Sequence, residues 1–348
     1  MTQKEKILKI LEGNRDCVVS GQQLADQLGI SRAAVWKAIK SLQGAGYVIS
    51  AKTNGGYALQ AVNDIVSRSA VEVCLGYPLK DAYFFDEVDS TNNFALTLAQ
   101  NGVAEGALVV ATQQSNGKGR VGKSFVSPKG GIYMSVVLRP NCPLAEATLL
   151  TPMAAVAVAK AIRKLCNVDA KIKWVNDIYL DGKKICGILT QAVTDFENEH
   201  VAAVVVGIGI NFDTPASAFD GELACKARSI FCAEQAKTED IKTEQGNREQ
   251  STAEQVKKQQ INAEQPTVTK SQLIAEVYGN LVELNVDFNS KKFMQDYRQL
   301  SVGKQIFYEF NSQQCQGIVL DIDDDGRLVV QTSGGIITVN CGEISIKL

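Results

Sequence analysis

A glycine-rich basic loop at residues 112–124 holds the side chains best suited to chemistry. In it, three glycines alternate with three basic residues, Lys118, Arg120 and Lys123. Glycine lets a backbone pass close to a ligand because it has no side chain and tolerates unusual torsions. The loop follows residues 107–111, an apolar run that predicts a buried strand. We therefore predict an anion-binding loop at a strand end, although a lone run of this composition would favour a solvated basic loop.

The same stretch matches the phosphate-binding pattern G-x-x-x-x-G-K-[ST] from Gly117 to Ser124. That motif requires a long helix directly after the lysine, with its N-terminus facing the phosphates. Here Pro128 and two glycines follow, and residues 132–138 have the composition of a strand. We therefore reject a P-loop and retain the anion-binding loop.

Composition limits the protein class. The chain has 348 residues, which predicts two to three domains, and a net charge of −2, which argues against a protein that coats nucleic acid throughout. Its 9 cysteines never form C-x-x-C, which predicts reduced thiols. The single histidine, His200, excludes a His-rich metal site and is predicted to lie in a loop. Without a signal pattern or an uncharged apolar run of about 18 residues, we expect a cytoplasmic protein with no membrane partner.

Residues 1–62 predict a winged helix-turn-helix domain that binds DNA. Capping residues mark the start of three helices at Thr2, Ser20 and Ser31, and residues 47–59 predict a hairpin that would form the wing. This segment has eight basic and four acidic residues, so it is positive in a chain that is negative overall. The alternative, a small helical protein-interaction domain, fits the wing and the charge less well.

The third helix of this segment presents basic and aromatic side chains outward, as a helix that enters a major groove would. The residues that we predict to contact DNA are Gln22, Ser31, Arg32, Trp36, Lys37 and Lys40.

The rest of the chain predicts an α+β fold. Residues 80–300 mix strands, helices and hairpins, which predicts a central domain with a mixed or largely antiparallel sheet; the family resemblance described below makes it the catalytic domain. Within it, residues 233–269 repeat Ala-Glu-Gln units without an aromatic residue, which predicts a disordered low-complexity insert; a solvated helix is the alternative. Residues 302–348 alternate short strands and turns, which predicts an SH3-like small β-barrel.

Three shorter segments complete the prediction. Residues 62–80 form a connector between the first two domains. Residues 145–165 are rich in alanine and valine and predict a long helix, and residues 170–180 predict a single strand.

Six short stretches, taken in order, resemble the biotin protein ligase family. They are residues 90–92, 114–123, 127–135, 173–178, 184–189 and 207–211. With the N-terminal winged helix, the chain resembles the bifunctional kind, the biotin operon repressor. The resemblance covers everything except the insert. Lys118, Lys123 and Phe125 stand where the family usually has two arginines and a tryptophan, and Val175 replaces a proline.

The resemblance implies an enzyme that joins biotin to ATP, with Mg²⁺, to form biotinyl-5′-AMP. It then implies transfer of biotin to a lysine of biotin carboxyl carrier protein, a subunit of acetyl-CoA carboxylase. It also implies a homodimer that, when bound to the adenylate, represses biotin biosynthesis at operator DNA. Such chemistry needs fixed cations where negative charge accumulates and reactants held in line.

The resemblance also assigns roles to individual residues. The catalytic residues would be Lys184, Arg120 and Asp177, and Asp177 would also bind Mg²⁺. Biotin would contact Ser90, Thr91, Asn92, Gln114, Gly117, Lys118, Arg120 and Lys184. ATP would contact Lys118, Arg120, Lys123, Phe125, Lys173, Asn176 and Asn211. We expect Trp174 to serve packing rather than catalysis.

Two other functions compete with this one. The first is a transcription factor that keeps a ligase-like domain only to sense its ligand. The loss of Lys184 would favour this function, but Lys184 is present. A lipoate ligase has a similar architecture, but its glycine-rich signature is absent here. Labelled biotin, ATP and an acceptor domain separate the three, because only the biotin ligase leaves acid-stable label on the acceptor.

Overall fold

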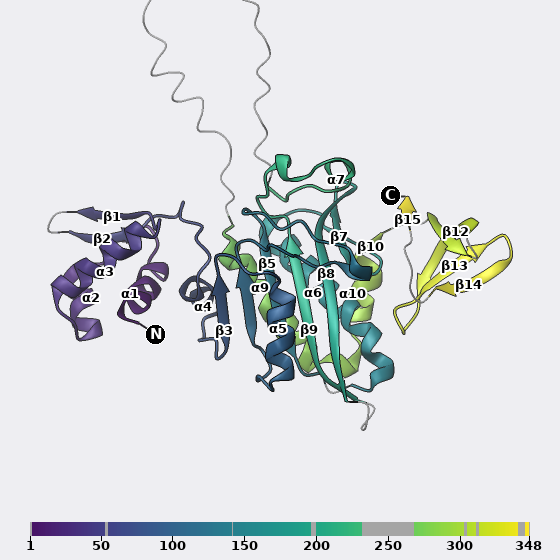
Figure 1. Ribbon diagram of the computed structural model, residues 1–348, viewed down its shortest axis with the longest axis horizontal. Coiled ribbons are helices and arrows are strands. Elements are labelled where there is room, and N and C mark those ends of the chain that lie inside the picture. Colours follow the sequence, from purple (N-terminus) through teal and green to yellow (C-terminus); the bar gives the residue numbers. More distant parts are fainter. Residues whose placement is uncertain are drawn as a thin grey trace, which may run out of the picture.

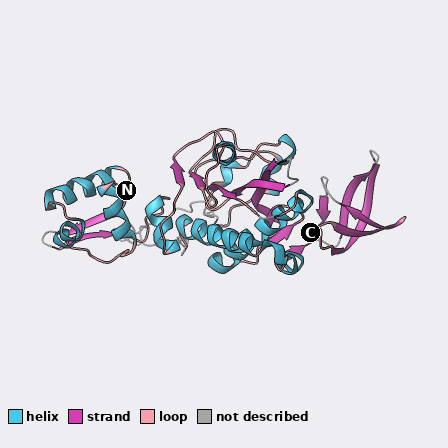
Figure 2. Ribbon diagram, turned by 90° about the horizontal axis from the view of Figure 1, so that it is seen from below, coloured by secondary structure: helices cyan, strands magenta, loops and turns pink. Residues whose placement is uncertain are grey.

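The computed structural model describes residues 2–52, 55–140, 142–195, 200–231, 268–302, 305–310, 313–339 and 345–347. Three units lie in a row along the longest axis of the molecule (Figure 1), and Figure 2 shows the same succession from below. They are a helical unit with a hairpin, a central unit around an 8-stranded sheet, and a 5-stranded sheet near the C-terminus.

The first unit has the predicted order of helix, helix, turn, helix and hairpin. Its elements are α1 (Gln3–Glu12), α2 (Gly21–Leu28), α3 (Arg32–Gly44), β1 (Ile49–Lys52) and β2 (Gly56–Leu59). Thr2 and Ser20 form the capping boxes, and the Ser31 hydroxyl accepts the amide of Ala34. Apolar side chains one turn apart, such as Ile7 and Leu11, meet Val35 and Ile39 in the unit's own core. The predicted helix-turn-helix is confirmed.

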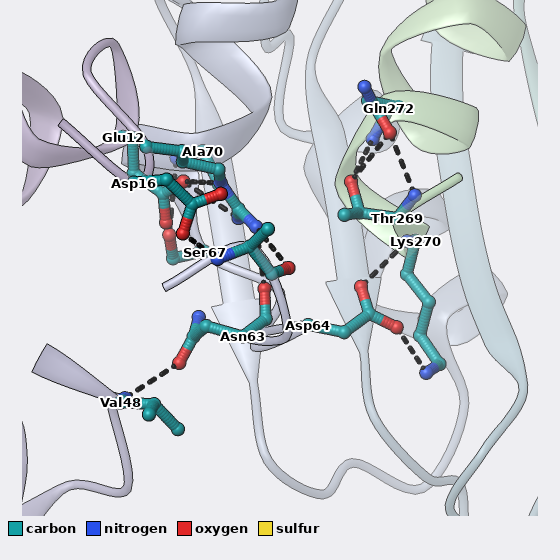
Figure 3. A network of polar contacts seen from close by, with 12 residues as sticks. Glu12, Asp16, Val48, Asn63, Asp64, Ser67, Ala70, Thr269, Lys270 and Gln272 are labelled. Atoms are coloured by element: carbon teal, nitrogen blue, oxygen red, sulfur yellow. Dashed lines mark hydrogen bonds and ion pairs between the residues drawn. The ribbon is translucent and has the colours of Figure 1, made fainter. Parts of the chain in front are cut away.

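The segment predicted as a connector contains a helix, α4 (Arg68–Leu75), and joins the first unit to the second. Asn63 and Asp64 point in opposite directions from the chain before it (Figure 3). The Asn63 side-chain oxygen accepts the amide of Val48 at 3.1 Å, next to the wing. The Asp64 carboxylate accepts both the backbone amide and the ammonium of Lys270, at 2.8 and 2.7 Å. The linker is therefore fixed to both units.

A buried carboxylate on α4 strengthens this joint. The Glu72 side chain is 1% exposed and accepts from Lys9 of α1 at 2.6 Å and from Arg68 at 2.8 Å. Burial alone would raise the pKa of Glu72, but hydrogen bonds from Arg68, Lys9 and the amide of Leu79 outweigh it and hold that pKa below 4.5. Glu72 therefore stabilises the fold above the unfolded pKa, and this stabilisation is lost as the pH falls through the folded pKa.

We expect Glu72→Gln to lower the free energy of unfolding at neutral pH by about 1–2 kcal/mol. The loss is modest because Lys9 and Arg68 are 33% and 37% exposed and can be rehydrated. The loss should shrink as the pH falls below 4.5, where protonation weakens the wild-type contacts as well. Urea unfolding across this range measures it, and a loss that does not depend on pH would contradict the assignment.

The central unit is built on a mixed sheet, as predicted. Its strands are β3 (Ala82–Phe85), β4 (Leu108–Ala111), β5 (Ile132–Leu138), β6 (Lys171–Lys173), β7 (Asp177–Leu180), β8 (Lys183–Asp195), β9 (His200–Ile210) and β10 (Ser301–Val302). The strand order is β10-β6-β7-β8-β9-β5-β4-β3. The two outer pairs, β10–β6 and β3–β4, are parallel, and the inner pairs are antiparallel.

Helices cover both faces of this sheet. They are α5 (Thr91–Gln100), α6 (Leu150–Cys166), α7 (Glu222–Lys226), α9 (Lys270–Val286) and α10 (Phe293–Leu300), with 3-10 turns at Arg120–Gly122, Leu144–Leu149, Ala216–Ala218 and Phe288–Ser290. Alternate residues of β9 point to opposite sides, as a strand requires: Val204 and Val206 pack with α6 and α9, and Ala203 and Val205 pack with α5. The helical segment Leu144–Cys166 is long and apolar enough to cross a membrane, but 67% of its apolar 18-residue window is buried inside the protein.

The predicted long helix over residues 145–165 is present, with a first segment of 3-10 geometry that leads directly into α6. Two other local predictions were wrong. Residues 170–180 are not one strand but the hairpin β6–β7, whose turn at 174–176 is held by partners far away in the sequence. His200 begins β9, opposite Asp195, instead of lying in a loop.

The C-terminal unit is a small antiparallel sheet. Its strands are β11 (Gln305–Phe310), β12 (Gln313–Ile322), β13 (Leu328–Thr332), β14 (Gly335–Val339) and β15 (Ser345–Lys347), in the order β14-β13-β12-β11-β15. Among the described strands, the two edge strands β14 and β15 do not pair with each other, so the predicted closed SH3-like barrel is not confirmed. Residues 233–267 of the predicted insert lie outside the described residues. Thr269, the last residue of the predicted insert, is the N-cap of α9.

Candidate functional site

A cavity of about 760 Å³ opens in the central unit between the start of α5, the glycine-rich loop, the β6–β7 turn and strands β8 and β9. It brings together nearly all residues that the sequence predicts for the two ligands. They are Ser90, Thr91, Asn92, Gln114, Lys118, Arg120, Lys123, Phe125, Lys173, Asn176, Asp177, Lys184 and Asn211. Gly117 is the exception: it is not among the lining residues, although a Cβ there would lie 3.1 Å from the side-chain nitrogen of Gln114, which is one of them.

Neutral polar groups form one end of the cavity. Ser90 is the N-cap of α5, so its neighbours in the first turn face the cavity. The Thr91 amide and hydroxyl both donate to the side-chain oxygen of Gln114, at 2.8 and 3.1 Å. The Gln114 amide nitrogen donates to the hydroxyl of Ser127 at 2.9 Å. Gln114 is thus fixed from both sides.

Asn92 is held from behind by residues that sequence reasoning missed. Its amide nitrogen donates to the side-chain oxygen of Gln191 at 3.0 Å, and its oxygen accepts the Ser135 hydroxyl at 2.7 Å. A Cβ on Gly207 would lie 1.8 Å from the Asn92 oxygen, so glycine is required there. Ser135 stands inside a stretch that carries the family resemblance, but Gln191 lies beyond every such stretch and gave no signal.

We expect Gly207→Ala to weaken ligand binding at this end by at least about 30-fold, because the new methyl group must displace Asn92 and strain the strand by roughly 2 kcal/mol or more. Gly279→Ala on α9 is the matched control, since a Cβ there meets nothing within 4 Å and Gly279, like Gly207, does not have a positive φ. Isothermal titration with biotin measures the effect, and wild-type affinity in Gly207→Ala would contradict this geometry.

The glycine-rich loop folds as a small closed turn over the cavity. The Gly119 amide donates to the Lys123 carbonyl at 2.7 Å, and the Phe125 amide donates to the Gly117 carbonyl at 2.9 Å. A Cβ on Gly117 would lie 2.4 Å from the Phe125 carbonyl oxygen, which explains this glycine. A strand rather than a helix follows, which agrees with the rejection of a P-loop. The Arg120 guanidinium donates across the cavity to the Asn176 side-chain oxygen at 3.0 Å.

Phe125 lies over two glycines on neighbouring strands. A Cβ on Gly209 would come within 2.5 Å of its ring, and one on Gly187 within 3.0 Å. Tyr133 meets the ring edge-on, with centroids 6.4 Å apart. The bare backbone of β8 and β9 therefore provides a flat surface beside an aromatic ring, which suits a planar ligand group.

Cations gather at the other end of the cavity. The Lys184 ammonium lies 2.7 Å from a carboxylate oxygen of Asp177, whose strand β7 pairs with β8. Burial lowers the pKa of Lys173; nearby Lys184 lowers it further, and Asp177 opposes both. Asn176 is fixed between two partners, since its amide nitrogen donates to the Ile188 carbonyl at 2.8 Å. One carboxylate thus lies among several cations, which suits a polyanionic ligand.

Three apolar residues that sequence reasoning missed also line the cavity. They are Phe219, Leu223 and Ala227, in and around α7. They come from a segment without regular periodicity, so no sequence pattern marks them as lining a site.

The first unit presents a second candidate site on α3. Arg32, Lys37 and Lys40 are exposed, and Trp36 is 56% exposed, which is unusual for so large an aromatic ring. Two other predicted contacts are already engaged within the unit. The Gln22 amide donates to Asp26 at 2.7 Å, and the Ser31 hydroxyl caps α3. The exposed side chains form a basic and aromatic face of the kind that binds a nucleic-acid groove.

Three family models match the chain. They are the biotin/lipoate A/B protein ligase family over residues 84–211, an HTH domain over residues 3–58, and the biotin protein ligase C-terminal domain over residues 303–347.

Similar proteins match over the full length. The bifunctional ligase/repressor BirA of Bacillus subtilis is 31% identical over 348 residues, which is 99% of each chain. The protein of that name from Bacillus spizizenii is 32% identical over 94% of each chain. A structure of biotin protein ligase from Aquifex aeolicus in complex with biotin and ATP shares the fold, with a TM-score of 0.56 and 21% identity over 77% of this chain and 99% of that one. The chain therefore belongs to the biotin protein ligase family, in its bifunctional ligase/repressor branch.

Proposed function

We propose that the two ends of the cavity have different roles in the biotin ligase reaction. The observation that carries it is the polarity of the cavity: neutral, fixed hydrogen-bonding groups around Gln114 at one end, and cations around Lys184 at the other. Biotin has a neutral ureido ring at one end and a carboxylate at the other, so it fits this gradient in one orientation only. ATP then shares the cationic end.

The neutral end would recognise the ureido ring of biotin. Ser90, Thr91 and Gln114 offer donors and acceptors whose positions are set by α5 and by Ser127. A small neutral ligand gains specificity from a few well-aimed polar groups, because each unpaired one is costly when buried. Asn92 would complete this pocket from the side of β8.

The cationic end would carry the first chemical step. A carboxylate oxygen of biotin attacks the α-phosphorus of ATP, the bond to the β-phosphate breaks, and pyrophosphate leaves. Lys184 lies where these two anions would meet, and Arg120 and Lys118 would cover the product from the loop. Lys123, Lys173, Asn176 and Asn211 would orient the phosphates, and Phe125 would pack against adenine.

Asp177 fits a magnesium ion that accompanies the nucleotide. It is the one carboxylate among the described lining residues, and its neighbour is the polar side chain of Asn176. Magnesium keeps several waters and takes its other ligands from phosphate oxygens, so one carboxylate suffices. The ion would supply positive charge to the phosphates, and Asp177 would hold it there while releasing Lys184 from the ion pair.

The second step would transfer biotin to a protein. The amine of a lysine on biotin carboxyl carrier protein attacks the anhydride carbonyl, AMP leaves, and the amine loses one proton to solvent. Asp177 and Lys173 line the cavity and would orient that lysine. ATP and this acceptor place the reaction in the cytoplasm.

The N-terminal unit would serve as an operator-binding domain of a homodimer. One recognition helix has few contacts, and two half-sites double the footprint. The exposed face of α3 supports binding through Arg32, Trp36, Lys37 and Lys40.

Incubation with labelled biotin, ATP and an acceptor domain tests the ligase proposal. We expect acid-stable label on the acceptor lysine and biotin-dependent exchange of pyrophosphate into ATP. Ligand binding without either activity would instead support a sensor, and transfer of lipoate would support the related ligase.

A further inference from the structure

The C-terminal sheet has no evident role in the cavity. Among the described residues, none after Ala227 lines it. Any influence of this unit on the reaction must therefore pass through an intermediate element. The β6–β7 turn is the element that touches both, because Lys173, Trp174, Asn176 and Asp177 line the cavity. Trp174 and Val175 of the same turn also form hydrogen bonds with residues of the C-terminal segments.

The back of this turn is attached at three points. Val302 of β10 pairs with Lys173 of β6, in parallel. The hydroxyl of Tyr297, which is fully buried, donates to the Val175 carbonyl at 3.0 Å. The indole N–H of Trp174 donates to the Gly326 carbonyl at 2.9 Å, and this contact is buried. Each attachment comes from a segment more than a hundred residues further along the chain.

Gly326 belongs to a rigid turn between β12 and β13. The Asp323 carboxylate accepts the amides of Asp325 and Arg327 at 3.0 and 2.9 Å, which fixes the turn locally. Gly326 has φ +77, and a Cβ there would lie 3.3 and 3.4 Å from Leu149 and Pro152 near the start of α6. The turn is thus wedged between α6 and Trp174.

Arg298 anchors this turn to the central unit as well. Its guanidinium, on α10, donates to the Ile322 carbonyl at 2.6 Å and to Asp324 at 2.5 Å. Ile322, Leu328 and Trp174 share one hydrophobic core. The contact between the C-terminal sheet and the β6–β7 turn is therefore part of the folded core.

We propose that Trp174 is a positioning residue, through which the Asp323–Arg327 turn of the C-terminal sheet aligns Lys173, Asn176 and Asp177 for attack on the α-phosphate. Trp174 lines the cavity, but its polar atom, the indole nitrogen, donates to Gly326, so we assign it a role in holding its neighbours. The proposal rests on the adenylation chemistry assigned to the cavity. A shift of about 1 Å in such groups costs on the order of 100-fold in rate, so a small loosening should be measurable.

Trp174→Phe tests this, because it keeps a ring in the core and removes only the donor to Gly326. We expect kcat for biotin-dependent pyrophosphate exchange to fall about 10- to 100-fold, while KM for biotin stays within about twofold, because the biotin end of the cavity is not attached to this turn. A role in stability alone would lower Tm and leave kcat unchanged below the melting range. Unchanged kcat would therefore overturn the proposal.

A matched pair of glycine variants gives a second test on the same sheet. Gly326 and Gly335 both have positive φ, +77 and +118, so alanine strains both turns. Only Gly326 adjoins Trp174 and α6; a Cβ on Gly335 meets nothing within 4 Å. We expect Gly326→Ala to lower kcat severalfold and Gly335→Ala to leave it unchanged. Equal kcat in both would refute the positioning role, whereas a wild-type protein without exchange activity would refute the adenylation itself.

Discussion

Lys184→Ala is expected to reduce adenylate formation by about 10²–10³-fold while the protein keeps its fold. Lys184 is the cation at the proposed meeting point of two anions, and its ammonium is held ready by Asp177 at 2.7 Å. A donor fixed in place before the reaction stabilises developing charge without reorganisation, and removing one is costly for this reason. Biotin-dependent pyrophosphate exchange measures the first step alone, so no acceptor protein is needed.

Lys183→Ala is the matched control for this variant. Lys183 precedes Lys184 on β8 but is not among the residues that line the cavity, and its ammonium donates to the Ala224 carbonyl at 3.4 Å. The loss of positive charge is the same in both variants. Wild-type exchange in Lys184→Ala, or an equal loss in Lys183→Ala, would show that the catalytic cation has been wrongly assigned.

Local sequence rules predicted the helix starts of the first unit. Thr2, Ser20 and Ser31 act through hydrogen bonds to residues three positions away, so the whole signal lies in a few letters. The same holds for the glycine-rich loop, where Gly117 and Gly119 are needed for contacts within ten residues. The predicted ligand residues converge because four strands, the glycine-rich loop and α5 meet at one cavity, which periodicity alone does not reveal.

The β6–β7 turn shows why other parts could not be predicted. Trp174-Val175 is apolar, and no glycine stands at 174–176, so the composition of residues 170–180 favours one continuous strand. The turn is stabilised instead by Tyr297 and Gly326, whose distance along the sequence hides the contact. Gln191 was missed for the same reason, since its role depends on Asn92, which lies on another element. Both the β6–β7 turn and the role of Gln191 thus depend on partners that are distant in the sequence.

The joint at Asp64 and Glu72 was hidden in a similar way. The sequence between the first two units predicted a linker, because α4 has only 8 residues, although Ser67 and Gly76 cap it. This segment matters because of its two ion pairs: Glu72 binds Lys9 of α1, and Asp64 binds Lys270 of α9. Lys270 also lies 5.0 Å from the ring centre of Phe212, directly after the cavity residue Asn211. The DNA-binding unit is therefore packed on elements that lead to the ligand site.

The final prediction concerns this link between ligand and DNA. Arg120→Gly should release the adenylate about 10- to 100-fold faster, because it removes a charged hydrogen bond donor from the cover of the cavity and loosens the loop. Released adenylate should label random surface lysines, and repression should weaken. Ligand and operator must favour each other by the same factor, so operator DNA should in turn slow adenylate release in the wild type.

Val121→Gly separates charge from flexibility in this prediction. Val121 is the next residue, has φ 54 and is 83% exposed, so glycine adds backbone freedom there and keeps Arg120 in place. Adenylate release by gel filtration and operator affinity by fluorescence anisotropy can be measured on the three proteins side by side. If both variants lose adenylate equally, loop order rather than the guanidinium retains it. If Arg120→Gly binds adenylate and operator as tightly as the wild type, the loop is not the link between the two sites.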